Sequence, residues 1–113
     1  FNFAPAVRNY TYNMLTSGRT KTVWLGERFR DDVYFLPGAP GGAADPAPIN
    51  AVTFSPRGLA TNAVGPGGGQ LYLTDQAGFN TGTGKVYRIV ISGSGEVEAQ
   101  IRDFTNATWS EFN

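Results

Sequence analysis

Glycine and proline interrupt this chain at short intervals, and that punctuation constrains its fold more than any other feature. The 113 residues include 15 Gly and 7 Pro but only one Met. Both residues are common in turns and unfavourable inside helices and strands, so long uninterrupted elements are excluded over most of the sequence. The pattern favours a single domain, residues 1–113, that is rich in short strands and loops, with helix as the minority element.

Five short segments between these breaks have the composition of strands. They are residues 32–36, 49–55, 70–74, 85–92 and 96–101. Segment 85–92 is expected to be the best buried, because apolar residues occupy both of its faces. Segment 96–101 alternates strictly, with Val97, Ala99 and Ile101 expected to face inward, and a short glycine turn before it predicts a hairpin with 85–92. The β region therefore covers about 32–101, and a tail, 102–113, follows it.

The N-terminal segment is predicted to be helical. Val7, Tyr10 and Met14 recur at helical spacing, which indicates a helix over about 4–18 that could extend to 28. Thr20–Leu25 also has the β-branched residues of a strand, so two interpretations stay open there. One helix followed by consecutive strands predicts an α+β fold, in which the N-terminal helix packs against antiparallel β-sheets.

The residues for catalysis are scarce. The chain has no Cys and no His, which removes thiolate nucleophiles, imidazole bases and the commonest transition-metal ligands. Adjacent Asp31 and Asp32 would point to opposite sides of a strand, and the loop 75–82 has one carboxylate where a calcium loop needs several. We therefore expect no enzyme activity, no cofactor and no metal site.

The charges are unevenly distributed although the net charge is zero. Residues 1–30 hold five basic residues against one acidic residue, a balance of +4. The remaining residues hold four basic against eight acidic residues, a balance of −4. The pattern is consistent either with solvated surface charges or with electrostatic matching between neighbouring subunits.

Three stretches, in this order, resemble the GspH/FimT-like minor pseudopilin family. They are Val52-Thr53-Phe54-Ser55-Pro56-Arg57-Gly58, Gly69-Gln70-Leu71-Tyr72-Leu73 and Val86-Tyr87-Arg88-Ile89-Val90-Ile91-Ser92-Gly93-Ser94-Gly95. The family has a strand ending in F-x-P-x-G, a second strand, and a strand of the R-x-I-x-I-S type that leads through Gly into the last strand. The resemblance implies a pilin-like fold whose apolar N-terminal half-helix is missing from this sequence.

The resemblance also implies a function. Such a chain would be a structural subunit, a minor pilin or pseudopilin, that helps initiate or build the filament of a type IV pilus or a type II secretion system. Its partners would be other pilins and the inner-membrane assembly platform, and the chain would be the periplasmic domain of a membrane-anchored protein. We expect the isolated domain to be monomeric. The expected contacts with other subunits lie on the basic N-terminal segment, at Arg8, Tyr10, Met14, Arg19 and Lys21.

Two other functions are weighed against this one. DNA-uptake pilins of the FimT branch have a Gly-Arg-x-Arg motif at the start of the last strand, whereas this chain has Gly95-Glu96-Val97-Glu98. Acidic side chains there would repel phosphates, and nearby Arg88 and Arg102 are expected to pair with them, so DNA binding at this strand is not expected. An independent β adhesin or binding module is the other alternative.

Overall fold

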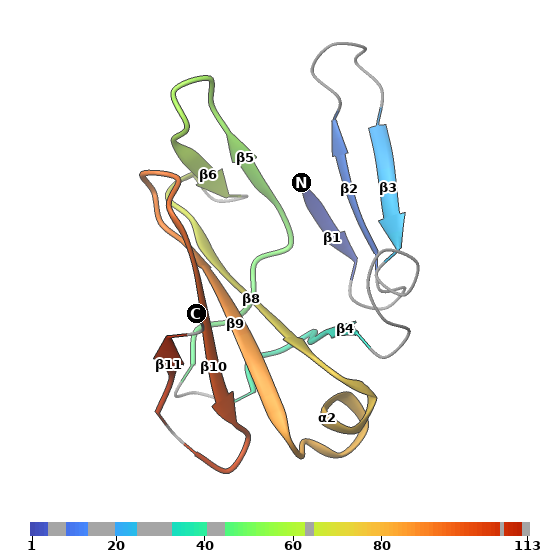
Figure 1. Ribbon diagram of the computed structural model, residues 1–113. Coiled ribbons are helices and arrows are strands. Elements are labelled where there is room, and N and C mark those ends of the chain that lie inside the picture. Colours follow the sequence, from blue (N-terminus) through green and yellow to red (C-terminus); the bar gives the residue numbers. More distant parts are fainter. Residues whose placement is uncertain are drawn as a thin grey trace.

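The computed structural model describes residues 1–4, 9–13, 20–24, 33–40, 45–62, 65–106 and 108–111, and these form three antiparallel sheets (Figure 1). The N-terminal sheet contains β1 (Asn2–Ala4), β2 (Asn9–Asn13) and β3 (Thr20–Trp24). A small sheet contains β5 (Val52–Phe54), β6 (Ala60–Asn62) and β7 (Gly65–Pro66). The largest sheet has the order β11-β10-β9-β8-β4, with β4 (Tyr34–Phe35), β8 (Gly69–Thr74), β9 (Lys85–Ile91), β10 (Val97–Asp103) and β11 (Ser110–Glu111).

The predicted α+β fold with an N-terminal helix is wrong. Strands dominate the protein, and β1, β2 and β3 occupy the described parts of the segment assigned to a helix over 4–18 and its extension to 28. The strand interpretation of Thr20–Leu25 is the correct one, since β3 covers Thr20–Trp24. Alternating aromatic and β-branched residues favour strands, and the β2–β3 pairing over five residue pairs supplies the backbone hydrogen bonds that a helix would have supplied locally.

The hairpin predicted from the glycine turn is confirmed. β9 and β10 pair over seven consecutive residues, from Val97 opposite Ile91 to Asp103 opposite Lys85. Gly95, with φ of +88°, closes the turn, and its N–H donates to the Ser92 carbonyl at 3.0 Å. Each of the other predicted strands also has a counterpart, in β4, β5 and β8.

The N-terminal sheet and the small sheet are joined through β1. The Phe3 N–H donates to the Asn50 carbonyl at 2.8 Å, and the Val52 N–H donates to the Phe1 carbonyl at 2.9 Å. Buried Val52 and Ala60 form a core cluster with Ile91 of β9. Strands from all three sheets therefore meet at one end of the five-stranded sheet, where Phe3 and Ile49 pack against this cluster.

β8 and not β9 is the best-buried strand. Leu71, Tyr72 and Thr74 are buried on β8, against two buried residues on β9. Both strands have a partner on each side in the sheet, but β8 also accepts hydrogen bonds from the backbone N–H groups of Leu36 and Ile49.

The predicted loop 75–82 contains a short helix, α2 (Gln76–Thr81). The Asp75 side chain caps it by accepting a hydrogen bond from the Gly78 N–H at 2.8 Å. The carboxylate considered as a calcium ligand therefore serves as a helix cap. No helix in the described ranges is long and apolar enough to cross a membrane.

Candidate functional site

Only part of the predicted subunit interface lies in the described residues. Arg8, Met14 and Arg19 lie outside them, whereas Tyr10 stands on β2 and Lys21 on β3. Tyr10 is half-buried, with its ring 6.3 Å from the Phe1 ring. These two residues predicted for the interface thus belong to a hairpin and not to the side of a helix.

The β9–β10 hairpin has an apolar face that the rest of the molecule covers incompletely. We call it the apolar hairpin face, and it consists of Tyr87, Ile89, Val97, Ala99 and Ile101, which the strand register places on one side of the sheet. Four of these side chains are half-buried, and Val97, expected to face inward, is 59% exposed. Exposed Val97 beside four half-buried apolar side chains offers an apolar contact to another protein.

The opposite face of the same sheet holds a buried polar cluster that the sequence did not predict. The Arg102 guanidinium lies 3.1 Å from the Asp45 carboxylate, and both side chains are more than nine-tenths buried. The Trp109 indole N–H donates to the other Asp45 oxygen at 3.1 Å. Arg102 Nη1 also donates to the carbonyl oxygens of Asp103, Phe104 and Asn106, at 3.3, 3.2 and 2.6 Å. The cluster therefore fastens the C-terminal segment and the loop at Asp45 to β10.

Trp109 is the centre of this cluster. The guanidinium carbons of Arg88 and Arg102 lie 4.5 and 4.8 Å from its ring centroid, within cation–π distance. Arg88 also donates from Nε to the Gln100 side-chain oxygen at 2.7 Å. The two arginines are thus not paired with Glu96 and Glu98, which corrects that prediction. The sequence did not predict the ion pair between Arg102 and Asp45, because 57 residues separate them. The one signal for it was that Asp45 is the single charged residue in the Gly/Ala/Pro-rich segment 39–48.

Tyr72 extends the cluster into the core. It is 1% exposed, and its hydroxyl donates to the Pro46 carbonyl at 2.7 Å. Burial raises the pKa of the Tyr72 phenol above its ordinary value, and the negative charge of Asp45 raises this pKa further. The phenol therefore stays neutral to a higher pH than an ordinary tyrosine, as a structural hydrogen-bond donor.

The turns that resemble the pseudopilin family meet one another in space. A Cβ added to Gly95 would lie 1.8 Å from the Gly58 carbonyl oxygen, and one added to Gly68 would lie 1.7 Å from the Ile91 carbonyl oxygen. The Ala60 N–H also donates to the Gly93 carbonyl at 3.0 Å. Two of the quoted stretches thus end in glycines that are in backbone contact, and a side chain at Gly95 would clash with the Gly58 carbonyl oxygen.

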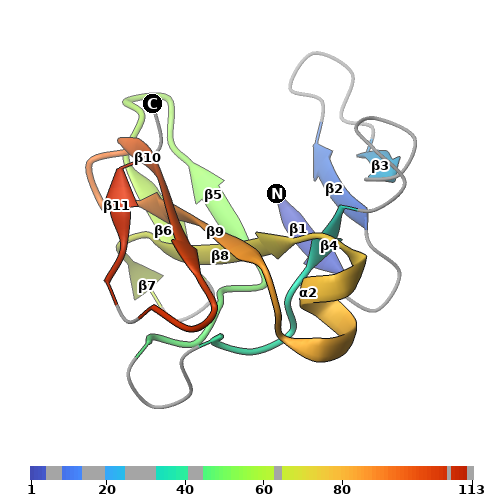
Figure 2. The same ribbon diagram turned by 60° about the horizontal axis from the view of Figure 1, so that its bottom comes forward.

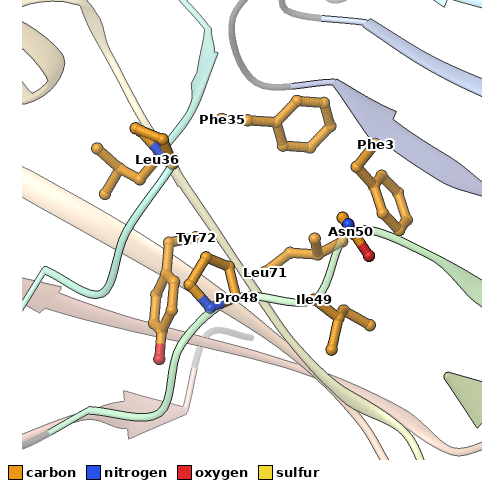
Figure 3. A pocket seen from close by; sticks show the side chains of 9 residues that line it. Phe3, Phe35, Leu36, Pro48, Ile49, Asn50, Leu71 and Tyr72 are labelled. Atoms are coloured by element: carbon orange, nitrogen blue, oxygen red, sulfur yellow. The ribbon is translucent and has the colours of Figure 1, made fainter. Parts of the chain in front are cut away.

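A small apolar cavity lies between β1, β4, β8 and the segment before β5 (Figure 3). Its volume is about 70 Å³, and Phe3, Phe35, Ile49 and Leu71 contribute to its walls. Sites for drug-sized molecules usually measure about 300 to 1,000 Å³, so this cavity is too small for such a ligand. It has room for one small apolar group.

A metal centre finds no support in the described part of the chain. No group of three or more His, Cys, Asp or Glu side chains is close enough there to hold a metal ion. Asp31 and Asp32, the adjacent acidic pair, lie outside the described residues. Comparisons of the chain with protein-family models, with curated proteins and with solved structures found no match.

Proposed function

We propose that the chain is a non-catalytic structural subunit of a type IV filament, a minor pilin or pseudopilin that acts as a periplasmic domain. The apolar hairpin face carries this proposal. Its exposed Val97 and half-buried neighbours form the kind of surface that assembly would cover, and they lie on strands that contain the family-like sequence. The backbone contact between Gly58 and Gly95 adds support, since it explains why glycine ends two of the stretches that resemble the family.

DNA uptake is the weaker alternative, on electrostatic grounds. Affinity for phosphates depends on Lys and Arg side chains that displace counterions. Glu96 and Glu98 are exposed at the relevant strand, while Arg88 and Arg102 are engaged with Gln100 and with Asp45. Few cations are therefore left on this hairpin to contact a nucleic-acid backbone.

The test is the presence of the chain in sheared filaments from bacteria that make it. The unaltered subunit should appear in the filament fraction, and Val97→Asp should lower its amount roughly tenfold or more, because burying a carboxylate in an apolar contact is costly. The melting temperature of the Val97→Asp domain should stay unchanged, since this side chain is mostly exposed.

Phe79→Asp is the control for a carboxylate placed elsewhere on the surface, and its melting temperature is measured as well because the Phe79 ring stacks on Tyr34 at 4.8 Å. Phe79 is 38% exposed on α2, at the far end of β9 from the hairpin turn (Figure 1). This variant should enter filaments normally. Absence of the unaltered chain from the filament fraction would refute the proposed function.

A further inference from the structure

The longest edge strand in the described part of the chain is β3. The edge strands β4, β7 and β11 contain two residues each, and Pro66 in β7 has no N–H to donate. β3 is also an edge strand, because only β2 pairs with it among the described strands, and it is five residues long. An edge of this length presents a row of backbone groups for pairing with another chain.

The register shows which backbone groups of β3 face outward. Phe1 and Phe3 direct their backbone groups toward residues 50 and 52, so Asn2 and Ala4 direct theirs toward β2. Continuing this alternation across β2 places the backbone groups of Lys21 and Val23 toward β2. The N–H and C=O groups of Thr20, Thr22 and Trp24 therefore point away from the sheet.

Among the described strands, β10 has a second open stretch, at its beginning. β11 pairs only with Gln100 and Ile101, so the described strands leave Val97–Ala99 without a partner on that side. The Glu96 carbonyl accepts from the Ser92 N–H, which places the backbone groups of Glu96 and Glu98 toward β9. Those of Val97 and Ala99 consequently face outward.

We propose that β3 of one copy adds antiparallel to this open stretch of β10 in the next copy, an inference that rests on the proposed function. Thr22 would pair with Val97 and Thr20 with Ala99, since all four residues direct backbone groups outward. This register sets Lys21 directly opposite Glu98. The overlap of three residues equals the β5–β6 pairing within the chain.

The charge distribution selects this pairing over self-pairing of β3. Two β3 strands would bring together two N-terminal segments of charge +4 each, whereas pairing with β10 brings the +4 segment to residues 31–113, which have a charge of −4. Glu96 and Glu98 are exposed and have no salt-bridge partner among the described residues.

The contact would be head-to-tail, and its two edges lie on opposite sides of the molecule (Figures 1 and 2). A contact between two different surfaces does not close into a two-fold dimer; it builds a ring or an open filament. Because the two strands overlap over three residues only, the contact between copies is weak in dilute solution. It becomes strong enough to form once the copies are held next to one another.

Disulfide cross-linking tests the pairing, and the absence of native cysteine makes the result easy to interpret. Directly opposed residues of antiparallel strands have Cα atoms about 4.5 to 5.5 Å apart, within the range that a disulfide spans. A mixture of Thr22→Cys and Val97→Cys single variants, concentrated and mildly oxidised, should give a cross-linked heterodimer. The double variant should give a ladder of oligomers. Cross-linking of Thr22→Cys alone, or no heterodimer in the mixture, would overturn the proposal.

Charge reversal tests the electrostatic part. Lys21→Glu should lower the heterodimer yield between about twofold and thirtyfold, because a weak attraction becomes a repulsion of similar size. Glu98→Lys in the partner variant should restore the yield. Lys85→Glu, a reversal of the only other lysine, should leave it unchanged, and an equal loss there would contradict the proposed pairing.

The two proposals fail in different ways. If the subunit is present in filaments but no heterodimer forms, the edge pairing is wrong and the filament function stands. If the heterodimer forms but the subunit is absent from filaments, the filament function is wrong and the edge pairing stands as self-association.

Discussion

Replacing Arg102 with methionine tests the buried cluster that fastens the C-terminal segment. The Arg102 side chain is 5% exposed and that of its partner Asp45 is 9% exposed. Methionine is a flexible apolar side chain that fills irregular space, so the change mainly removes charge and hydrogen bonds. It leaves the Asp45 carboxylate buried without its cation and removes the donor to three carbonyl oxygens.

The expected loss of stability is large. Removing one partner of a buried ion pair costs about 3 to 5 kcal/mol, while the whole free energy of unfolding of a domain is about 5 to 15 kcal/mol. At roughly 4 °C per kcal/mol for a chain of this size, Arg102→Met should lower the melting temperature by about 12 to 20 °C.

Thermal and urea unfolding followed by circular dichroism measure this loss. Lys85→Met is the control, since it removes the 3.0 Å ion pair between Lys85 and Asp103, whose side chains are 59% and 51% exposed. An exposed pair is worth about 0 to 1 kcal/mol. Equal stability of the Arg102→Met and Lys85→Met variants would refute the reasoning. Adding Asp45→Asn to Arg102→Met should cost less than the sum of the two single changes, because no uncompensated charge then stays buried.

Three further changes test other parts of the structure. The free energy of unfolding should fall as the pH rises above about 10, because unfolding lets the Tyr72 phenol ionise at its ordinary pKa. Urea unfolding at a series of pH values measures this fall, and Tyr72→Phe should make it shallower. Gly95→Ala should lower stability by about 1 to 3 kcal/mol more than Gly84→Ala, since both have positive φ but only Gly95 meets a backbone oxygen, that of Gly58; equal losses would count against the close contact. Asp75→Ala should cost about 0.5 to 2 kcal/mol as a lost helix cap, with no change in melting temperature on adding a chelator to the unaltered protein.

Local sequence pattern predicted the central hairpin well. The alternation of 85–92 and 96–101 and the intervening glycines gave two strands whose pairing is confirmed. Such hairpins depend on neighbouring residues, so a short window of sequence contains nearly all the relevant interactions. Local pattern gave the wrong structure for the N-terminal segment. Three residues at helical spacing indicated a helix, although the regions around Tyr10 and Thr22 have the composition of strands.

The sequence by itself determined a glycine-punctuated chain rich in short strands, the central hairpin with its apolar face, and two segments of opposite charge, but not the fold class. Tertiary structure alone decided how exposed that face is and where the buried charges pair. The sequence pattern placed Arg102 in the tail after the last predicted strand, whereas it lies in β10, and its partner Asp45 is 57 residues away. Pairing over such a distance depends on how separate segments pack, because a charge can stay buried only where the folded chain brings its counter-ion and hydrogen-bond acceptors to the same place.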